Sequence, residues 1–186
     1  MHIRIWNIKD KTMKAQQQII SSQDIVILLK IIALDNKTWF QNTLAESLHI
    51  SQSEISKSLM RSKYAGLLDS SGKKVNRLAL MEFLQYGIRY VFPQQPGAIV
   101  RGIATAHSAA PLHNIIQSKE PYVWPSAKGS IRGQSILPLY PSVIDAVKQD
   151  ETLYELLALV DAIRVGRARE KELAIQELKK RITDGE

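Results

Sequence analysis

The chain has 186 residues, no cysteine, and 25 Lys and Arg residues against 18 Asp and Glu, which gives a net charge of +7. The absence of cysteine excludes disulfide frameworks, thiolate zinc sites and cysteine nucleophiles. The length predicts one domain, or one domain with a small satellite, and the basic balance favours a polyanionic partner, above all nucleic acid.

Membrane insertion is not expected. The most apolar stretch, residues 25–34, has only ten residues and contains Lys30, whereas about 20 apolar residues are needed to span a bilayer. The first residues also lack the apolar core of a signal peptide. We therefore expect a cytoplasmic protein with no membrane partner.

The prolines divide the chain. All seven lie within residues 93–141, and proline breaks helices, so we expect helices on both sides of that segment. The predicted fold is mainly α, of the α+β class. It consists of an N-terminal arm or strand (1–20), a helical domain (21–92), a Pro- and Gly-rich segment of loops and short strands (93–149) and a C-terminal helical region (150–186).

The helical domain begins with two predicted helices. Asp24 or Ser22 is expected to cap a helix over residues 25–34, whose dense apolar residues place it at the centre of the core. Thr38 is expected to cap a second, short helix that ends at Leu48.

Residues 44–68 predict a helix-turn-helix. Ser51 and Glu54 form a Ser-x-x-Glu capping box that starts a helix over residues 52–65, and Gly66 is suited to end it. A tight turn joins this helix to the one that ends at Leu48, which is helix-turn-helix geometry.

The second of these helices and the segment after it carry much of the positive charge. Residues 51–77 hold six cations and two anions, whereas residues 151–186 hold seven cations and eight anions. Short polar groups near a helix N-terminus suit base edges, and cations further along suit phosphates. The candidate DNA-binding residues are Ser51, Gln52, Ser53, Ser56, Lys57, Arg61, Lys63, Lys73, Lys74 and Arg77.

Residues 22–78 resemble the winged helix-turn-helix of the MarR-like bacterial transcriptional regulators. The matching positions are Leu44, Ala45, Leu48, Ile50, Ser51, Ile55, Ser56, Leu59, Gly66, Leu67 and Leu68. The resemblance implies a regulator, not an enzyme, that binds double-stranded DNA with helix 52–65 in the major groove. Two other interpretations stay open: a helix pair with a solvated charged face, and a protein-interaction module, such as an antitoxin-like partner or adaptor, that binds another protein through residues 93–186.

The Pro-rich segment predicts a small hairpin, in which residues 122–124 pair with residues 131–136. Two arginines flank its aromatic cluster, and we take Arg101, His107, Trp124 and Arg132 as the hypothesis for an effector or partner site. The alternative is that the arginines lock loops by bonding carbonyls, and that His107 is a structural or a surface histidine.

Chemistry at the histidines is not favoured. His107 and His113 lack a third ligand at metal-binding spacing, and His107, Ser108 and Asp145 lack the nucleophile elbow of a hydrolase. We therefore predict no metal, no cofactor and no catalytic residue.

The last predicted elements are helical. Asn76 is expected to cap a helix over residues 78–90, and Asp150 caps an amphipathic tail that forms one long helix or two. A tail of this kind suits homodimerisation, which in turn suits a helix-turn-helix that reads paired half-sites. The alternative is that the tail packs against helix 78–90 of its own chain.

Overall fold

A computed structural model describes residues 19–35 and 37–183, so the arm or strand predicted for residues 1–20 lies almost wholly outside the described residues. The fold is mixed α+β, with helices on both sides of a small three-stranded sheet in chain order. Its main elements are α2 (Ser22–Ala33), α3 (Gln41–Leu48), α4 (Gln52–Tyr64), α5 (Arg77–Glu82), a π-helical turn (Phe83–Gly87), α6 (Ile88–Val91), β1 (Ile99–Ala104), β2 (Tyr122–Pro125), β3 (Ile131–Ser135), α7 (Val143–Ala146), α8 (Glu151–Val165) and α9 (Ala168–Thr183).

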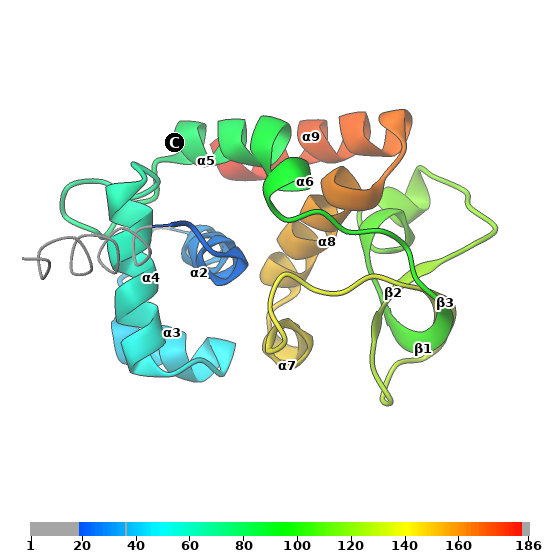
Figure 1. The fold of residues 1–186 in the computed structure, drawn as a ribbon, viewed down its shortest axis with the longest axis horizontal. Coiled ribbons are helices and arrows are strands. Elements are labelled where there is room, and N and C mark those ends of the chain that lie inside the picture. Colours follow the sequence, from blue (N-terminus) through cyan, green and yellow to red (C-terminus); the bar gives the residue numbers. More distant parts are fainter. Residues whose placement is uncertain (1–18, 36, 184–186) are drawn as a thin grey trace, which may run out of the picture.

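Helix α8 lies in the middle of the molecule, with α2, α3 and α4 on one side and the sheet on the other (Figure 1). Both α2 and α8 are buried around most of their circumference: residues 25–29 and 156–160 are 0–2% exposed. One hydrophobic cluster runs from Ile25 to Ile182 and includes both helices. The prediction that the first helix is central to the core is therefore confirmed.

The predicted caps of the first two helices are wrong. Helix α2 begins after Ser21, so neither Ser22 nor Asp24 is its N-cap; Asp24 instead accepts a hydrogen bond from the Ser21 N–H, at 2.8 Å. Helix α3 begins after Phe40 rather than after Thr38, because the hydroxyl of Thr43 accepts the Phe40 N–H at 3.2 Å. Both corrections have the same cause, which is a polar side chain at the third helical position that bonds back to the start of the helix.

The sheet is a small closed barrel, and the predicted hairpin is wrong. Strand β1 pairs antiparallel with both β2 and β3, and β2 and β3 pair with each other in parallel. Glycines allow this close packing: a Cβ on Gly102 would lie 2.1 Å from the carbonyl oxygen of Trp124, and one on Gly129 would lie 2.1 Å from Gly102. The turn that contains Gly129 therefore folds over β1, where only residues without a side chain fit.

The tail forms two helices that pack within the chain. They are separated at Gly166 and Arg167, and α9 buries Ala174, Leu178 and Ile182 against the rest of the protein. Figure 1 shows α9 beside α5, and the two elements are in contact. The apolar faces expected to form a dimer are thus covered by the chain itself, as in the intramolecular alternative. Within the described residues, no helix is both long and apolar enough to cross a membrane.

Candidate nucleic-acid interface

The N-terminal half of α4 presents a polar face to solvent. The helix starts at Ser51, whose hydroxyl accepts the Glu54 N–H at 3.3 Å, and it follows a tight turn in which His49 has φ +53°. The side chains on this face are exposed: Ser51, Gln52, Ser53, Ser56 and Lys57. The cap is as predicted, but the carboxylate of Glu54 bonds Lys57 Nζ at 2.8 Å. Five of the ten candidate DNA-binding residues therefore lie on one exposed surface.

Arg61 is not available for a phosphate, contrary to the prediction. Its Nε and Nη2 donate to the two carboxylate oxygens of Asp24, at 2.9 and 2.6 Å. The Arg61 side chain is 12% exposed and the Asp24 carboxylate is 0% exposed. The hydrogen bond to Asp24 raises the pKa of the Arg61 guanidinium, in opposition to burial, which lowers it. Arg61 therefore joins α4 to α2.

The segment after α4 forms a tight, charged turn. Leu68 and Val75 pair in a single antiparallel bridge, and between them the Asp69 carboxylate accepts the backbone N–H groups of Lys73 and Lys74, at 3.0 and 3.1 Å. These bonds, together with one from the Ser71 hydroxyl, lower the pKa of Asp69 to about 2. The turn is thereby fixed by an anion while Lys73 and Lys74 stay exposed.

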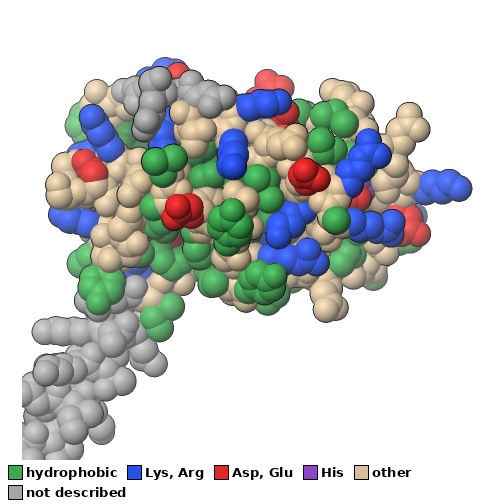
Figure 2. Space-filling view, turned by 90° about the horizontal axis from the view of Figure 1, so that it is seen from above, with side chains coloured by type: hydrophobic (Ala, Val, Ile, Leu, Met, Phe, Trp, Pro, Cys, Tyr) green, Lys and Arg blue, Asp and Glu red, His purple; other side chains and the backbone are tan. Residues whose placement is uncertain are grey.

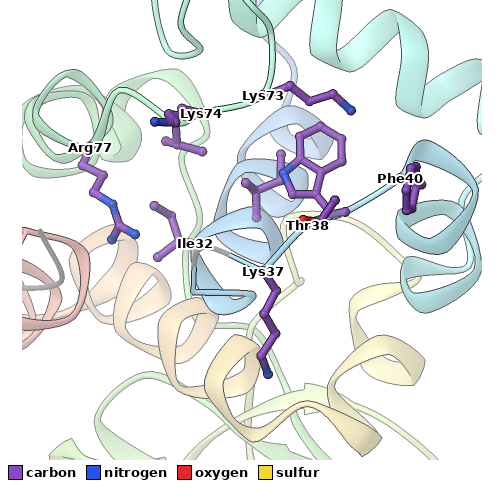
Figure 3. Close-up of a pocket in the computed structure, with 10 residues that line it drawn as sticks. Ile32, Lys37, Thr38, Phe40, Lys73, Lys74 and Arg77 are labelled. Carbon is purple, nitrogen blue, oxygen red and sulfur yellow. The ribbon is translucent and has the colours of Figure 1, made fainter.

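Beside this turn lies a basic groove of about 720 Å³. It runs between the end of α2, the loop before α3 and the start of α5 (Figure 3). Its lining is Ile31, Ile32, Lys37, Thr38, Trp39, Phe40, Lys73, Lys74, Val75 and Arg77. Sequence reasoning missed Lys37, Trp39 and Phe40; the signal was a cation next to two aromatic residues in a loop.

Arg77 lies at this groove but is partly engaged by the tail. Its Nη1 donates to the backbone carbonyl of Ile182 in α9, at 2.7 Å. Lys63, by contrast, is exposed and has no ion-pair partner among the described residues. Of the five cations predicted to meet phosphates, three have no carboxylate partner among the described residues: Lys63, Lys73 and Lys74.

The second predicted site is not assembled. Arg101 and Arg132 are exposed and face each other as register partners of β1 and β3. Trp124 is buried, and its Nε1 donates to Asp161 at 2.6 Å. His107 is also buried, 3.8 Å from Glu170. The arginines and the buried pair therefore belong to different environments, and Trp124 has a structural partner.

A buried polar network on α8 was missed by sequence reasoning. Asp161 accepts from Thr105, Trp124 and Arg164, at 2.9, 2.6 and 2.6 Å, and Arg164 also donates to the carbonyls of Phe92 and Leu137. Burial raises the pKa of Asp161, while these donors act to lower it. The network joins four separate stretches of chain to α8. Its partners outside α8 are far apart in the sequence, so no sequence spacing predicts it.

His107 and His113 line a second cavity, of about 620 Å³, together with Ser108 and Lys119. Asp145 is not part of it; this residue is exposed and pairs with Lys148. The triad of His107, Ser108 and Asp145 is therefore not formed. The described residues also contain no group of three His, Asp or Glu side chains placed to hold a metal ion.

Comparisons of the chain with protein-family models, with curated proteins and with solved structures found no match. Function is therefore inferred from the polar face of α4, the charged turn and the basic groove.

Proposed function

We propose that this chain is a sequence-specific regulator that binds double-stranded DNA, with a winged helix-turn-helix formed by α3, α4 and the turn at residues 68–75. The observation that carries the proposal is the exposed polar face of α4. Hydroxyl, amide and ammonium groups project from the first two turns of a capped helix, and these groups make hydrogen bonds to base edges in the major groove.

The bond between Lys57 and Glu54 does not prevent a DNA contact. Lys57 is 58% exposed in this pair, and exposed pairs three residues apart on a helix contribute only about 0.3–0.5 kcal/mol. A phosphate or a guanine edge can replace the Glu54 carboxylate as the acceptor for the Lys57 ammonium group. Lys57 is accordingly free to exchange Glu54 for DNA.

The expected salt dependence follows from the cations that remain free. Each phosphate neutralised by a lysine contributes about −0.9 to the slope of log K against log salt. Contacts by Lys63, Lys73 and Lys74 alone give a slope of about −2.7 for each bound chain. Contacts by Arg61 and Arg77 as well would give about −4.5.

The mode of dimerisation is also part of the proposal. Because the apolar faces of the tail helices are buried against their own chain, a homodimer needs another surface. Tyr86 and Tyr90, at the end of the α5 to α6 segment, are 68% and 77% exposed. Figure 2, which views the molecule from the side of α5 and α9, shows exposed apolar side chains among the Lys and Arg side chains there.

The test is fluorescence anisotropy on duplex DNA from upstream of the gene, compared with scrambled duplex, at salt concentrations of roughly 50 to 200 mM. Gln52→Ala should reduce the preference for the upstream duplex, and Lys73→Ala should weaken binding to both duplexes and flatten the slope by about 0.9. Lys128→Ala is the matched control, because Lys128 is exposed in the turn between β2 and β3, and the sheet lies on the other side of α8 from α4 (Figure 1). Binding that is independent of salt, or no binding at the lowest salt, would refute the proposal.

A protein-interaction module is the second candidate, favoured by exposed apolar residues in the segment 93–186. Ile99 and Leu137 are 63% and 61% exposed. A partner that co-purifies in a 1:1 ratio and is lost with Ile99→Ser or Leu137→Ser would support this function, provided that the chain prefers neither duplex.

A further inference from the structure

The basic groove has the size and the polarity of a ligand site. Its volume of about 720 Å³ lies within the range of small-molecule sites. It contains no Asp or Glu but four cations, of which three come from one short segment: Lys73, Lys74 and Arg77. Among the described residues, none of Lys37, Lys73 and Lys74 has a carboxylate within 4.0 Å. This composition selects an anion.

The cations are held in place rather than spread by chance. The Asp69 carboxylate fixes the backbone of Lys73 and Lys74, and the tail fixes Arg77 through the Ile182 carbonyl. In Figure 3, Lys73 lies on one side of the groove, Lys74 and Arg77 lie on the other side, and Lys37 lies at its edge. Lys73 Nζ lies 4.4 Å from the Trp39 ring centroid. A cluster of ammonium and guanidinium donors on a fixed backbone suits a phosphate group.

An exposed aromatic ring stands next to these cations. Trp39 is 8% exposed and forms a wall of the groove, whereas Phe40 is 60% exposed. A ring that stays in water beside a phosphate-binding cluster offers a surface on which a planar base stacks. A phosphate without a base would gain no affinity from the Phe40 ring. The groove therefore suits an anion that also carries a planar base.

We infer that the basic groove binds a nucleotide, with its phosphates at Lys73, Lys74 and Arg77 and its base against Phe40. The nucleotide is either free or one unit of an unpaired strand. The site does not include the polar face of α4, but it shares Lys73 and Lys74 with the proposed duplex contacts.

The experiment is calorimetric titration of the full chain with four probes: pyrophosphate, AMP, ATP and a six-nucleotide single-stranded DNA. Phe40→Ala should weaken ATP binding at least fivefold and leave pyrophosphate binding unchanged, because stacking of one base contributes a factor of about 5 or more. Lys73→Ala should weaken every probe about tenfold. A free-nucleotide site would bind ATP more tightly than the six-nucleotide strand, and a strand site would show the reverse order.

Two controls separate this inference from the proposed duplex function. Lys128→Ala and Gln52→Ala should leave the affinity for ATP unchanged, and Gln52→Ala should still impair duplex recognition. Quenching of Trp39 fluorescence by ATP, absent in Trp39→Phe, would locate the ligand at the groove. Equal affinities of the parent chain and Phe40→Ala for ATP, no binding at millimolar concentration, or full ATP binding by Lys73→Ala in a chain with an unchanged melting temperature would each overturn it.

Discussion

Arg61→Ala should destabilise the protein rather than weaken its contact with DNA. In the folded chain, the Arg61 guanidinium is the main counter-charge of the Asp24 carboxylate, which is fully buried at the start of α2. Removal of the arginine leaves Asp24 with the Ser21 N–H as its remaining hydrogen-bond donor, at 2.8 Å. The variant therefore buries an ion without its partner.

The size of the effect can be worked from these contacts. Removal of one partner of a buried ion pair costs about 3–5 kcal/mol. Asp24 keeps one donor, and the side of the pair that Arg61 occupies is 12% exposed, so water can reach the carboxylate once Arg61 is gone. These features place the cost near the lower limit, about 3 kcal/mol, or a fall in Tm of about 6–12 °C for a chain of this length.

The assay is calorimetric melting together with urea unfolding, with Lys63→Ala as the control on the same helix. Lys63 is exposed and its removal should change stability by less than about 0.5 kcal/mol. An Asp24→Leu, Arg61→Met double variant should recover most of the loss, because an apolar pair leaves no charge to solvate. If Arg61→Ala melted within about 2 °C of the parent and lost duplex affinity instead, the structural role assigned to Arg61 would be wrong.

Three further outcomes are expected. Trp124→Phe, which removes one donor to Asp161, should lower the free energy of unfolding by about 1–2 kcal/mol in urea; no change would show that the buried bond contributes little. Asp150→Ala removes both the cap of α8 and the partner of Lys30, and should cost about 2–4 kcal/mol, whereas Asp145→Ala, which removes an exposed carboxylate, should leave the melting curve unchanged. The pKa of Asp69 is lowered on folding, so its bonds stabilise the turn above the ordinary value of 3.8, and this contribution is lost as the pH falls towards about 2. Carboxyl NMR should accordingly find Asp69 still charged at about pH 3, and a midpoint near 3.8 would contradict the geometry of the turn.

The features that could be predicted from the sequence are those decided by neighbouring residues. Ser51 caps α4, Asn76 caps α5 and Asp150 caps α8, and each side chain accepts the N–H three residues further on. Such contacts depend on residue type and spacing alone, so a sequence pattern contains them. The pattern failed at Thr38, because the hydroxyl of Thr43, inside the helix, accepts the Phe40 N–H and the helix begins after Phe40.

The features that could not be predicted depend on partners far along the chain. Arg61 looks like any exposed cation of α4 until α2, 37 residues earlier, supplies Asp24. The strands of the barrel have the right residues for a hairpin, but their pairing is decided by β1 and its Gly102, which lie outside the hairpin. The surface of α4 was therefore predictable in its polar half and at Lys63, but not at Arg61.

The central position of α8 has a consequence for how the protein is made. Lys30 of α2 pairs with Asp150, and Thr105 and Trp124 bond to Asp161, so both ends of the molecule depend on a helix that the ribosome completes only at Val165. Although domains generally begin to fold from the N-terminus during synthesis, the apolar α2 emerges some 120 residues before the helix that covers it. Nascent chains arrested near residue 145 should therefore be cut readily by protease. Chains held on the ribosome by an added C-terminal linker, long enough for residue 183 to leave the exit tunnel, should resist. Because α8 is made so late, the apolar surface of α2 cannot be fully covered until most of the chain has been synthesised.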